Sequence, residues 1–233
     1  MSDGDALVPA LGRLVSRLPE APNRSDALSE LMGTATDVLA LSGAAVTLVE
    51  DGRCEVAGAL PGELMEVAAA QQDCARGPGL DALRQGTPVA VPDVHRHRER
   101  WPEYTGAAVR HGVSAVVELP LQLGAVRLGV LGLYAPAPRE WTAADLSLGA
   151  LLAGLAANHL LTTDRLRRQQ QLTDQLQHAL DSRIVVEQAK GVIAGARRIG
   201  PDAAYDLIRT HARRHRIGVH EVARGIVELG LRL

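Results

Sequence analysis

AVVELPLQLGAVRLGVLGLY, residues 115–134, contains two apolar runs separated by Leu123-Gly124, a pattern typical of two strands joined by a tight turn. Two further apolar runs, residues 44–49 and 54–59, flank Asp51-Gly52, a pair that tolerates the positive φ angles of hairpin turns. Hairpins join antiparallel strands, and helical segments alternate unevenly with these strands. The sequence therefore predicts an α+β fold with an antiparallel sheet and flanking helices, and not a doubly wound parallel fold.

Helical segments surround these strands. Residues 1–24 form an amphipathic segment, which we expect to pack on its own domain or on a dimer partner. Apolar residues at helical spacing also predict helices over residues 25–41, 61–72 and 102–111. Together with the strands, these segments predict one α+β domain over residues 25–160.

A long helix is predicted after the last strand. Thr142 is a good N-cap, Asp145 follows it three positions later, and no proline occurs from there to Arg198. Leucines recur along this helix at an imperfect spacing of three and four: Leu148, Leu152, Leu155, Leu166, Leu176 and Leu180. Because exposed leucines at this spacing need a second helix, we expect a coiled-coil linker over residues 161–182 and a parallel or near-parallel homodimer.

The C-terminal region has the pattern of three helices separated by Gly200-Pro201 and Gly218. Each helix carries an apolar stripe that we expect to face inward. The stripes are Val185, Ala189, Val192, Ala196 and Ile199, then Ala204, Tyr205, Leu207, Ile208 and Ala212, and then Val219, Val222, Ala223, Ile226 and Val227. The sequence thus predicts a small all-α three-helix domain with Tyr205 in its core.

Charge is distributed unevenly along the chain. The net charge of the 233 residues is −2, but residues 1–164 carry 12 Lys and Arg against 20 Asp and Glu, whereas residues 165–233 carry 13 against 7. The C-terminal cations, nearly all arginine, gather on the outer faces of two helices, where they either contact nucleic-acid phosphates or form an ordinary solvated face. The candidate binding residues are Arg183, Lys190, Arg197, Arg198, Arg209, Arg213 and Arg216.

The C-terminal motifs resemble a known family. RIVVEQAKG at residues 183–191 and the later apolar stripes, with the glycine breaks between them, resemble the ANTAR domain over roughly residues 172–229. The resemblance implies that residues 172–233 form the RNA-binding domain of a transcription antitermination regulator, which as a dimer binds paired hairpins in nascent transcripts. At the position of Arg216 the family pattern often has Asn, so a specific RNA contact at that bend does not transfer.

The N-terminal half is similar to GAF domains, which sense small molecules or other signals. The similarity rests on Gly77–Gly86, Trp101-Pro102, Gly112-Val113, Leu119–Leu121 and Leu128–Tyr134. A GAF domain followed by an ANTAR domain is an arrangement familiar in actinobacteria, and it implies a signal-responsive regulator. Related GAF segments often have Cys at the position of Gly79, so a ligand or redox role of that cysteine does not transfer.

Composition argues against several other functions. Aromatic residues make up only 2% of the chain and Phe is absent, so RNA binding through rows of stacked aromatic rings is not expected. The sequence contains no signal peptide and no apolar run long enough to cross a bilayer comfortably, which predicts a cytoplasmic protein without a membrane anchor. It also contains no phosphate-binding loop and no catalytic triad signature, so no cofactor and no catalytic residue is predicted.

A thiol enzyme is one alternative. Some GAF-fold proteins reduce free methionine sulfoxide, and Cys54 and Cys74 are the two thiols that such chemistry could use here. His95, His97 and His111 could in principle bind a metal, but arginines alternate with the first two, so a polar surface loop is the better interpretation and no metal site is predicted.

A DNA-binding regulator is the other alternative. The break at Gly218 places two helices in succession, as in a helix-turn-helix. The helix after the break offers only His220 and Arg224 as outward basic residues, which is little for a helix that reads the major groove. We therefore expect RNA and not duplex DNA to be the partner.

Overall fold

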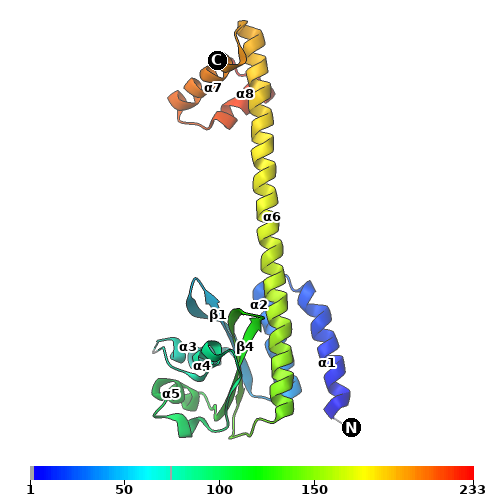
Figure 1. Cartoon of the computed structure of the whole chain (residues 1–233), viewed down its shortest axis with the longest axis vertical. Helices are drawn as coiled ribbons and strands as arrows, with labels where there is room; N and C mark the ends of the chain where they lie inside the picture. The colour runs from blue at the N-terminus through cyan, green and yellow to red at the C-terminus, as the bar shows by residue number, and fades with distance from the viewer. Residues whose placement is uncertain (1–2, 74) are drawn as a thin grey trace. The chain divides into compact units, whose positions relative to one another are not determined.

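A computed structural model describes residues 3–73 and 75–233, which form two compact units divided between Thr163 and Asp164. Cys74, one of the two candidate thiols, lies outside the described residues. The first unit contains a sheet with helices on both of its faces, and the second unit is helical (Figure 1).

The sheet consists of five antiparallel strands: β1 (Gly43–Glu50), β2 (Arg53–Leu60), β3 (Val89–Val91), β4 (Ala115–Leu123) and β5 (Val126–Ala135). Their order across the sheet is β2-β1-β5-β4-β3. Both predicted hairpins are confirmed, because Glu50 pairs with Arg53 across one turn and Leu123 with Val126 across the other. Gly52 and Gly124 have φ angles of 78° and 59°, as these tight turns require.

Helices cover both faces of this sheet. They are α1 (Asp3–Arg17), α2 (Arg24–Leu39), α3 (Met65–Asp73), α4 (Pro78–Gln85), α5 (Pro102–Arg110) and the first part of α6 (Ala143–Arg197), with short 3-10 turns at Leu18–Glu20, Gly62–Leu64 and Val94–His97. Figure 1 shows α3, α4 and α5 on one face and α2 and α6 on the other. The predicted α+β fold with flanking helices is confirmed.

Two cores form, one on each face of the sheet. The first lies between the sheet and α1, α2 and α6, and it contains Leu31, Val46 and Leu152. The second lies between the sheet and the helices α3 and α5, and it contains Trp101, Tyr104, Val116 and Tyr134. Since side chains alternate along a strand, neighbouring residues of β4 belong to opposite cores.

Helix α6 begins with the predicted capping box. The backbone N–H of Asp145 donates to Thr142 Oγ1, and that of Thr142 donates to Asp145 Oδ2, both at 3.1 Å. By length and composition alone, α6 is long and apolar enough to cross a membrane. Its residues Leu152, Ala156 and Leu160 are buried in the first core, and this packing accounts for the apolar character of the first part of the helix.

The second unit contains the rest of α6, followed by α7 (Pro201–His215) and α8 (Val219–Leu229). Pro201 occupies the first turn of α7, where its missing N–H costs nothing. The N–H of Gly218 donates to Glu221 Oε2 at 3.0 Å and so fixes the start of α8, which ends at Gly230 with a φ of 68°. The predicted three-helix unit and its glycine breaks are confirmed.

Candidate nucleic-acid interface

Small and branched side chains fill the core of the second unit. Its buried residues are Ala189, Ile193, Ala204, Ile208, Ala212, Val222, Ala223 and Ile226. The stripe predicted for the end of α6 is wrong at Val192 and Ala196, which are exposed, whereas Ile193 is buried. Helix α6 packs against α7 and α8 through Ala189 and Ile193, which are four residues apart. Val192 lies about 100° around the helix from Ile193 and so points away from this core. Val227 was also predicted to face inward and is 38% exposed.

Tyr205 lies at the surface and not in the core, which corrects the prediction from the sequence. Its side chain is 36% exposed, and Lys190 Nζ lies 5.9 Å from the centroid of its ring. The same Nζ forms an ion pair with Glu187 at 3.0 Å. Because a cation over a ring face is attracted by the ring quadrupole, this contact joins α6 to α7 and holds the ring at the edge of the core.

The cations of α7 continue the surface that begins at Tyr205. Arg209 and Arg213 follow it at intervals of four, Arg216 follows three positions later, and all three are exposed. Arg209 and Arg213 therefore share one face of α7 with Tyr205, and Arg216 directly follows the end of the helix. We call the surface formed by Lys190, Tyr205, Arg209, Arg213 and Arg216 the basic face.

Three cations of the basic face are free of acidic partners. Within residues 3–73 and 75–233, Arg209, Arg213 and Arg216 take part in no ion pair, whereas Arg224 Nη2 on α8 lies 3.1 Å from Glu228 Oε2. Unpaired guanidinium groups keep their donors available for phosphate oxygens. Helix α8, which would be the recognition helix of a helix-turn-helix, has its arginine already neutralised.

The other predicted binding residues lie on α6 or just after it. Arg183 is exposed seven residues before Lys190 and so lies on the same side of the helix. Arg197 lies seven residues after Lys190 and donates a hydrogen bond to the backbone carbonyl of Leu233. Arg198 follows the last helical residue with a φ of 52°. Arg197 therefore holds the C-terminal segment, and Arg183 remains unpaired among the described residues.

Arg216 has a left-handed backbone, with φ 56° and ψ 36°, directly after α7 ends. This conformation favours Gly and Asn over residues with larger side chains, which gives a physical reason for the Asn of the family pattern.

We expect Arg216→Gly to raise the free energy of unfolding by about 1 kcal/mol, measured by chemical denaturation. Arg209→Gly, in the middle of α7, should lower it by about 1 kcal/mol, and a loss of stability in both variants would contradict this account.

The leucines of α6 divide into two groups. Leu152 is buried in the first core, and Leu148 and Leu155 pack against it, so these three are occupied within the chain and are not free for a coiled coil. The later leucines are between 56% and 62% exposed: Leu166, Leu172, Leu176 and Leu180. Such a row of exposed leucines on one helix is typical of an interface.

Cys54, His97 and His111 have surroundings typical of structural residues and not of catalytic or metal-binding residues. Burial in β2 raises the pKa of the Cys54 thiol, the opposite of what a nucleophilic thiolate needs. The ring of His97 stacks on Trp101 with the centroids 5.1 Å apart, and His111 Nε2 lies 3.0 Å from Glu66 Oε2. Among the residues that the structure describes, no three His, Cys, Asp or Glu side chains gather so as to hold a metal ion.

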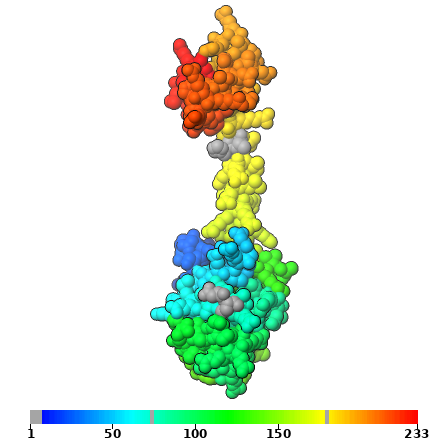
Figure 2. Space-filling view, turned by 90° about the vertical axis from the view of Figure 1, so that its left-hand side faces the viewer, coloured from blue at the N-terminus to red at the C-terminus, as the bar shows by residue number. Residues whose placement is uncertain are grey.

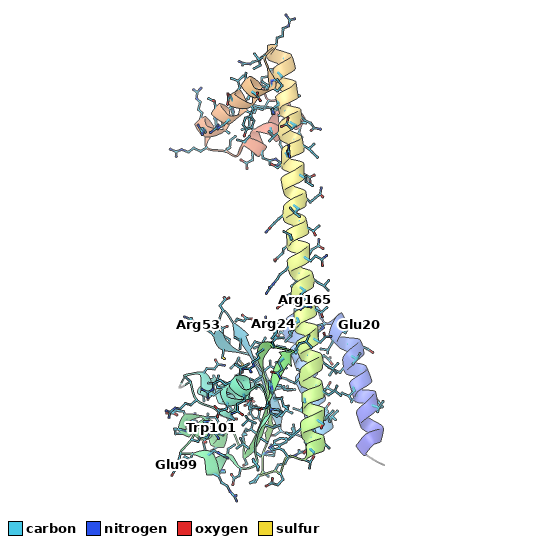
Figure 3. The ribbon with its side chains drawn as sticks, viewed as in Figure 1. Glu20, Arg24, Arg53, Glu99, Trp101 and Arg165 are labelled. Carbon is cyan, nitrogen blue, oxygen red and sulfur yellow. The ribbon has the colours of Figure 1, made fainter. Side chains whose placement is uncertain are left out.

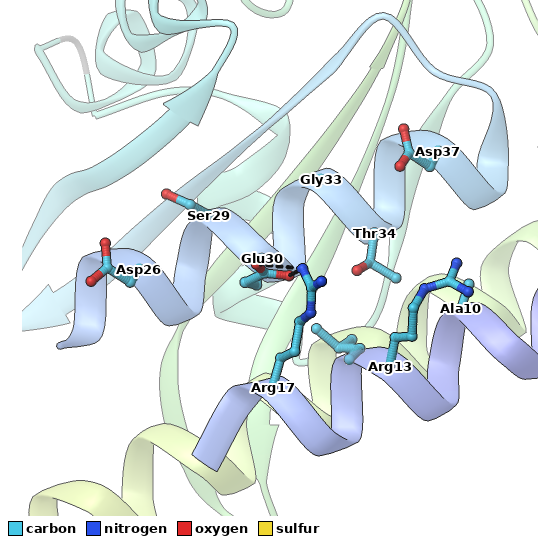
Figure 4. A pocket seen from close by; sticks show the side chains of 10 residues that line it. Ala10, Arg13, Arg17, Asp26, Ser29, Glu30, Gly33, Thr34 and Asp37 are labelled. Atoms are coloured by element: carbon cyan, nitrogen blue, oxygen red, sulfur yellow. Dashed lines mark hydrogen bonds and ion pairs between the residues drawn. The ribbon is translucent and has the colours of Figure 1, made fainter. Parts of the chain in front are cut away.

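A groove of about 500 Å³ runs between α1 and α2 (Figure 4). Arg13 and Arg17 line it from α1, and Asp26, Glu30 and Asp37 line it from α2. Arg17 Nη1 lies 3.1 Å from Glu30 Oε1. The lining therefore mixes both signs of charge, and part of that charge is paired across the groove.

Two family models match the chain: the GAF domain over residues 21–160 and the ANTAR domain over residues 174–227. The chain belongs to the GAF-domain family and carries a C-terminal ANTAR domain. Both resemblances drawn from the sequence are confirmed. ANTAR domains are RNA-binding antitermination modules and GAF domains are signal-sensing modules, so the architecture is that of a regulator. A search of curated proteins returned no match.

Solved structures similar to the chain share the fold of its GAF domain. The GAF domain of an Acinetobacter phosphoenolpyruvate-protein phosphotransferase has a TM-score of 0.55 and 14% identity, and the alignment covers 71% of this chain and 97% of that one. The free methionine-R-sulfoxide reductase of Neisseria meningitidis, in complex with its substrate, has a TM-score of 0.55 and 15% identity, covering 71% and 95%. A GAF domain of Synechocystis in its photoproduct state has a TM-score of 0.53 and 18% identity, covering 64% and 99%. These similarities concern the fold alone.

Proposed function

We propose that this protein is a signal-responsive, cytoplasmic regulator that binds RNA through its ANTAR domain and promotes transcription antitermination. The observation that carries the proposal is the exposed and unpaired set Arg209, Arg213 and Arg216 in a domain whose family binds RNA. A-form RNA is recognised through its backbone and its unpaired loop bases. Guanidinium groups suit both tasks, because they bind phosphate in a forked geometry and stack on bases. In this proposal the protein is not an enzyme.

The proposed RNA-binding form is a homodimer that binds two hairpins of one nascent transcript. The exposed leucines of α6 from Leu166 to Leu180 are the surface that we assign to the second chain. A dimer presents the basic face twice, and two linked binding events raise the overall affinity far above that of one. Occupation of both hairpins keeps the downstream terminator from forming, which is the antitermination step.

The proposed input is a small molecule or other signal at the GAF domain. Its binding changes the packing of α6 near His159, which is half-buried, and Thr162, which is exposed. This change alters the spacing between the two ANTAR domains of the dimer. Crosslinking across the dimer in the signal-bound and signal-free states tests the mechanism, and an unchanged spacing would contradict it.

A competition assay at fixed salt tests the RNA-binding proposal. The full chain is mixed with a labelled RNA carrying two hairpins, and unlabelled RNA or duplex DNA of equal charge is added. We expect unlabelled hairpin RNA to displace the label and duplex DNA to be a much weaker competitor, because the arginine of α8 is paired with Glu228. Equal competition by DNA would favour the helix-turn-helix alternative.

A further inference from the structure

The aromatic residues of this chain are few, and most of them gather in one place. The sequence contains two Trp, three Tyr and no Phe, and Trp101, Tyr104 and Tyr134 all lie in the core between the sheet and α3 and α5. The rings of Trp101 and Tyr104 meet edge to face with centroids 6.5 Å apart. Figure 3 labels Trp101 on this side of the sheet. The GAF domain thus concentrates its scarce aromatic rings in one of its two cores.

A carboxyl group is buried in the same region. Glu118 on β4 is 2% exposed, and alternation along the strand directs it to the same face as Val116 of this core. The Gln71 amide donates a hydrogen bond to the carboxylate, while Glu118 Oε1 and the hydroxyl of Tyr104 have no hydrogen-bond partner among the described atoms. A buried polar atom without a partner costs free energy, so two of them together require an explanation.

Glu118 lacks the cationic partner that another buried carboxylate of the domain has. Asp81 on α4 is also buried, but it forms ion pairs with Arg84 and with Arg100, whose Nη2 lies 2.6 Å from Asp81 Oδ2. Within the part of the chain that the structure describes, Glu118 has no such cation. Burial raises the pKa of Glu118 to about 8. Burial also raises the pKa of Tyr104 and of Tyr134, and the nearby Glu118 adds to both shifts. At neutral pH the carboxyl group is therefore mainly protonated until a cation joins it.

We infer that the GAF domain binds a small organic ammonium ion at this cluster, with Glu118 as its counter-charge and Tyr104 and Tyr134 as aromatic walls. The inference rests on the proposed sensing function and names the class of its ligand. A carboxylate beside aromatic faces is the combination that recognises an ammonium group, through a charge-assisted hydrogen bond and cation–π attraction. The N–H groups of the ligand satisfy the unpartnered oxygens of Glu118 and Tyr104.

The backbone lies close to the Glu118 carboxylate at two glycines. A β-carbon at Gly79 or at Gly132 would lie 3.0 Å from Glu118 Oε2. The N–H of Gly79, in the first turn of α4, donates to Gln71 Oε1 at 2.8 Å, so Gln71 links the carboxylate to the start of α4. In Figure 2 the helices α3 to α5, cyan to green, face the viewer and cover this region. A ligand that ionises Glu118 strengthens the hydrogen bond from Gln71, and through Gln71 this change reaches Gly79 at the start of α4.

Calorimetric titration of the full chain tests the inference. The probes are primary alkylammonium chlorides of one to four carbons, each compared with the alcohol and the carboxylate of equal length at constant ionic strength. We expect an ammonium probe to bind and the neutral and anionic probes not to bind. Repeating the titration at pH 7 in buffers of different ionisation enthalpy should show release of nearly one proton per bound cation, because Glu118 must ionise.

Three variants complete the test. Glu118→Gln keeps the shape of the protonated side chain and should weaken ammonium binding at least about tenfold and abolish the proton release. Tyr104→Phe keeps the ring and should weaken binding less while the proton release remains. Glu99→Gln removes an exposed carboxylate and is the matched control, with unchanged binding expected.

Several results would overturn the inference: no binding by any ammonium probe, equal binding by the alcohols or carboxylates, or unchanged binding and proton release in Glu118→Gln. RNA binding is measured on the same preparations. If hairpin RNA binds while no ammonium probe does, the ligand class is wrong and the RNA-binding function stands. If hairpin RNA does not bind at all, the proposed function fails whatever the GAF domain binds.

Discussion

Replacing Arg209 and Arg213 together by alanine is expected to lower the affinity for hairpin RNA roughly a hundredfold, since each lost charge-assisted contact costs about tenfold. Both residues are exposed on one face of α7 and take part in no ion pair among the described residues, so their donors are available to phosphate oxygens. Each lost phosphate contact also removes a released counterion. The slope of log affinity against log salt concentration should therefore fall by about two.

The measurement is a fluorescence anisotropy titration at several salt concentrations. The matched control is Arg167→Ala with Arg168→Ala, which removes the same charge from exposed positions of α6 outside the ANTAR core. We expect that control to change the affinity little, and circular dichroism of both double variants should match the unaltered chain. An equal loss in the two variants would mean that total charge, and not the basic face, determines binding.

The two hairpins and the helix breaks could be predicted because they depend on local signals. The turns at Asp51-Gly52 and Leu123-Gly124 need positive φ angles, which the structure contains. The start of α6 depends on Thr142 and Asp145, three residues apart. Such signals lie within a few residues of one another, so no knowledge of distant contacts is needed to read them.

The inward side of α6 in the ANTAR domain could not be predicted in the same way. Val192 and Ile193 are adjacent and both apolar, so periodicity does not distinguish a face through one from a face through the other. Tyr205 poses a similar problem, because it lies at the boundary between the buried and exposed faces of α7. Its position depends on Lys190, which is fifteen residues earlier and contacts it only once the helices pack.

No pattern in the sequence predicts the cluster around Glu118. A single acidic residue in an apolar strand is normally expected on a solvent-facing side. Here helices cover both faces of the sheet, so Glu118 has no solvent-facing side to occupy. The rings that surround it come from α5 and β5, and Gln71 comes from α3. Only the tertiary structure brings these elements together.

Replacing Leu176 and Leu180 together by aspartate is expected to convert the protein from a dimer to a monomer, measured by sedimentation equilibrium. The two side chains are 59% and 57% exposed and cover nothing within the described part of the chain, so their removal leaves the ANTAR core intact. In the dimer, two pairs of aspartates would face one another across the coiled coil, where burial of charge is unfavourable.

RNA binding by this variant separates dimerisation from hairpin recognition. Linked binding sites gain about 100- to 10,000-fold in overall affinity, so the monomer should lose a factor in that range for an RNA with two hairpins. Its affinity for a single hairpin should stay the same, because the basic face is untouched. Gln171→Asp with Gln175→Asp adds equal charge at exposed positions on the other side of α6 and should leave both affinities unchanged. If the aspartate variant remains dimeric, or binds the two-hairpin RNA as tightly as before, the leucines from Leu166 to Leu180 are not the interface that pairs the ANTAR domains.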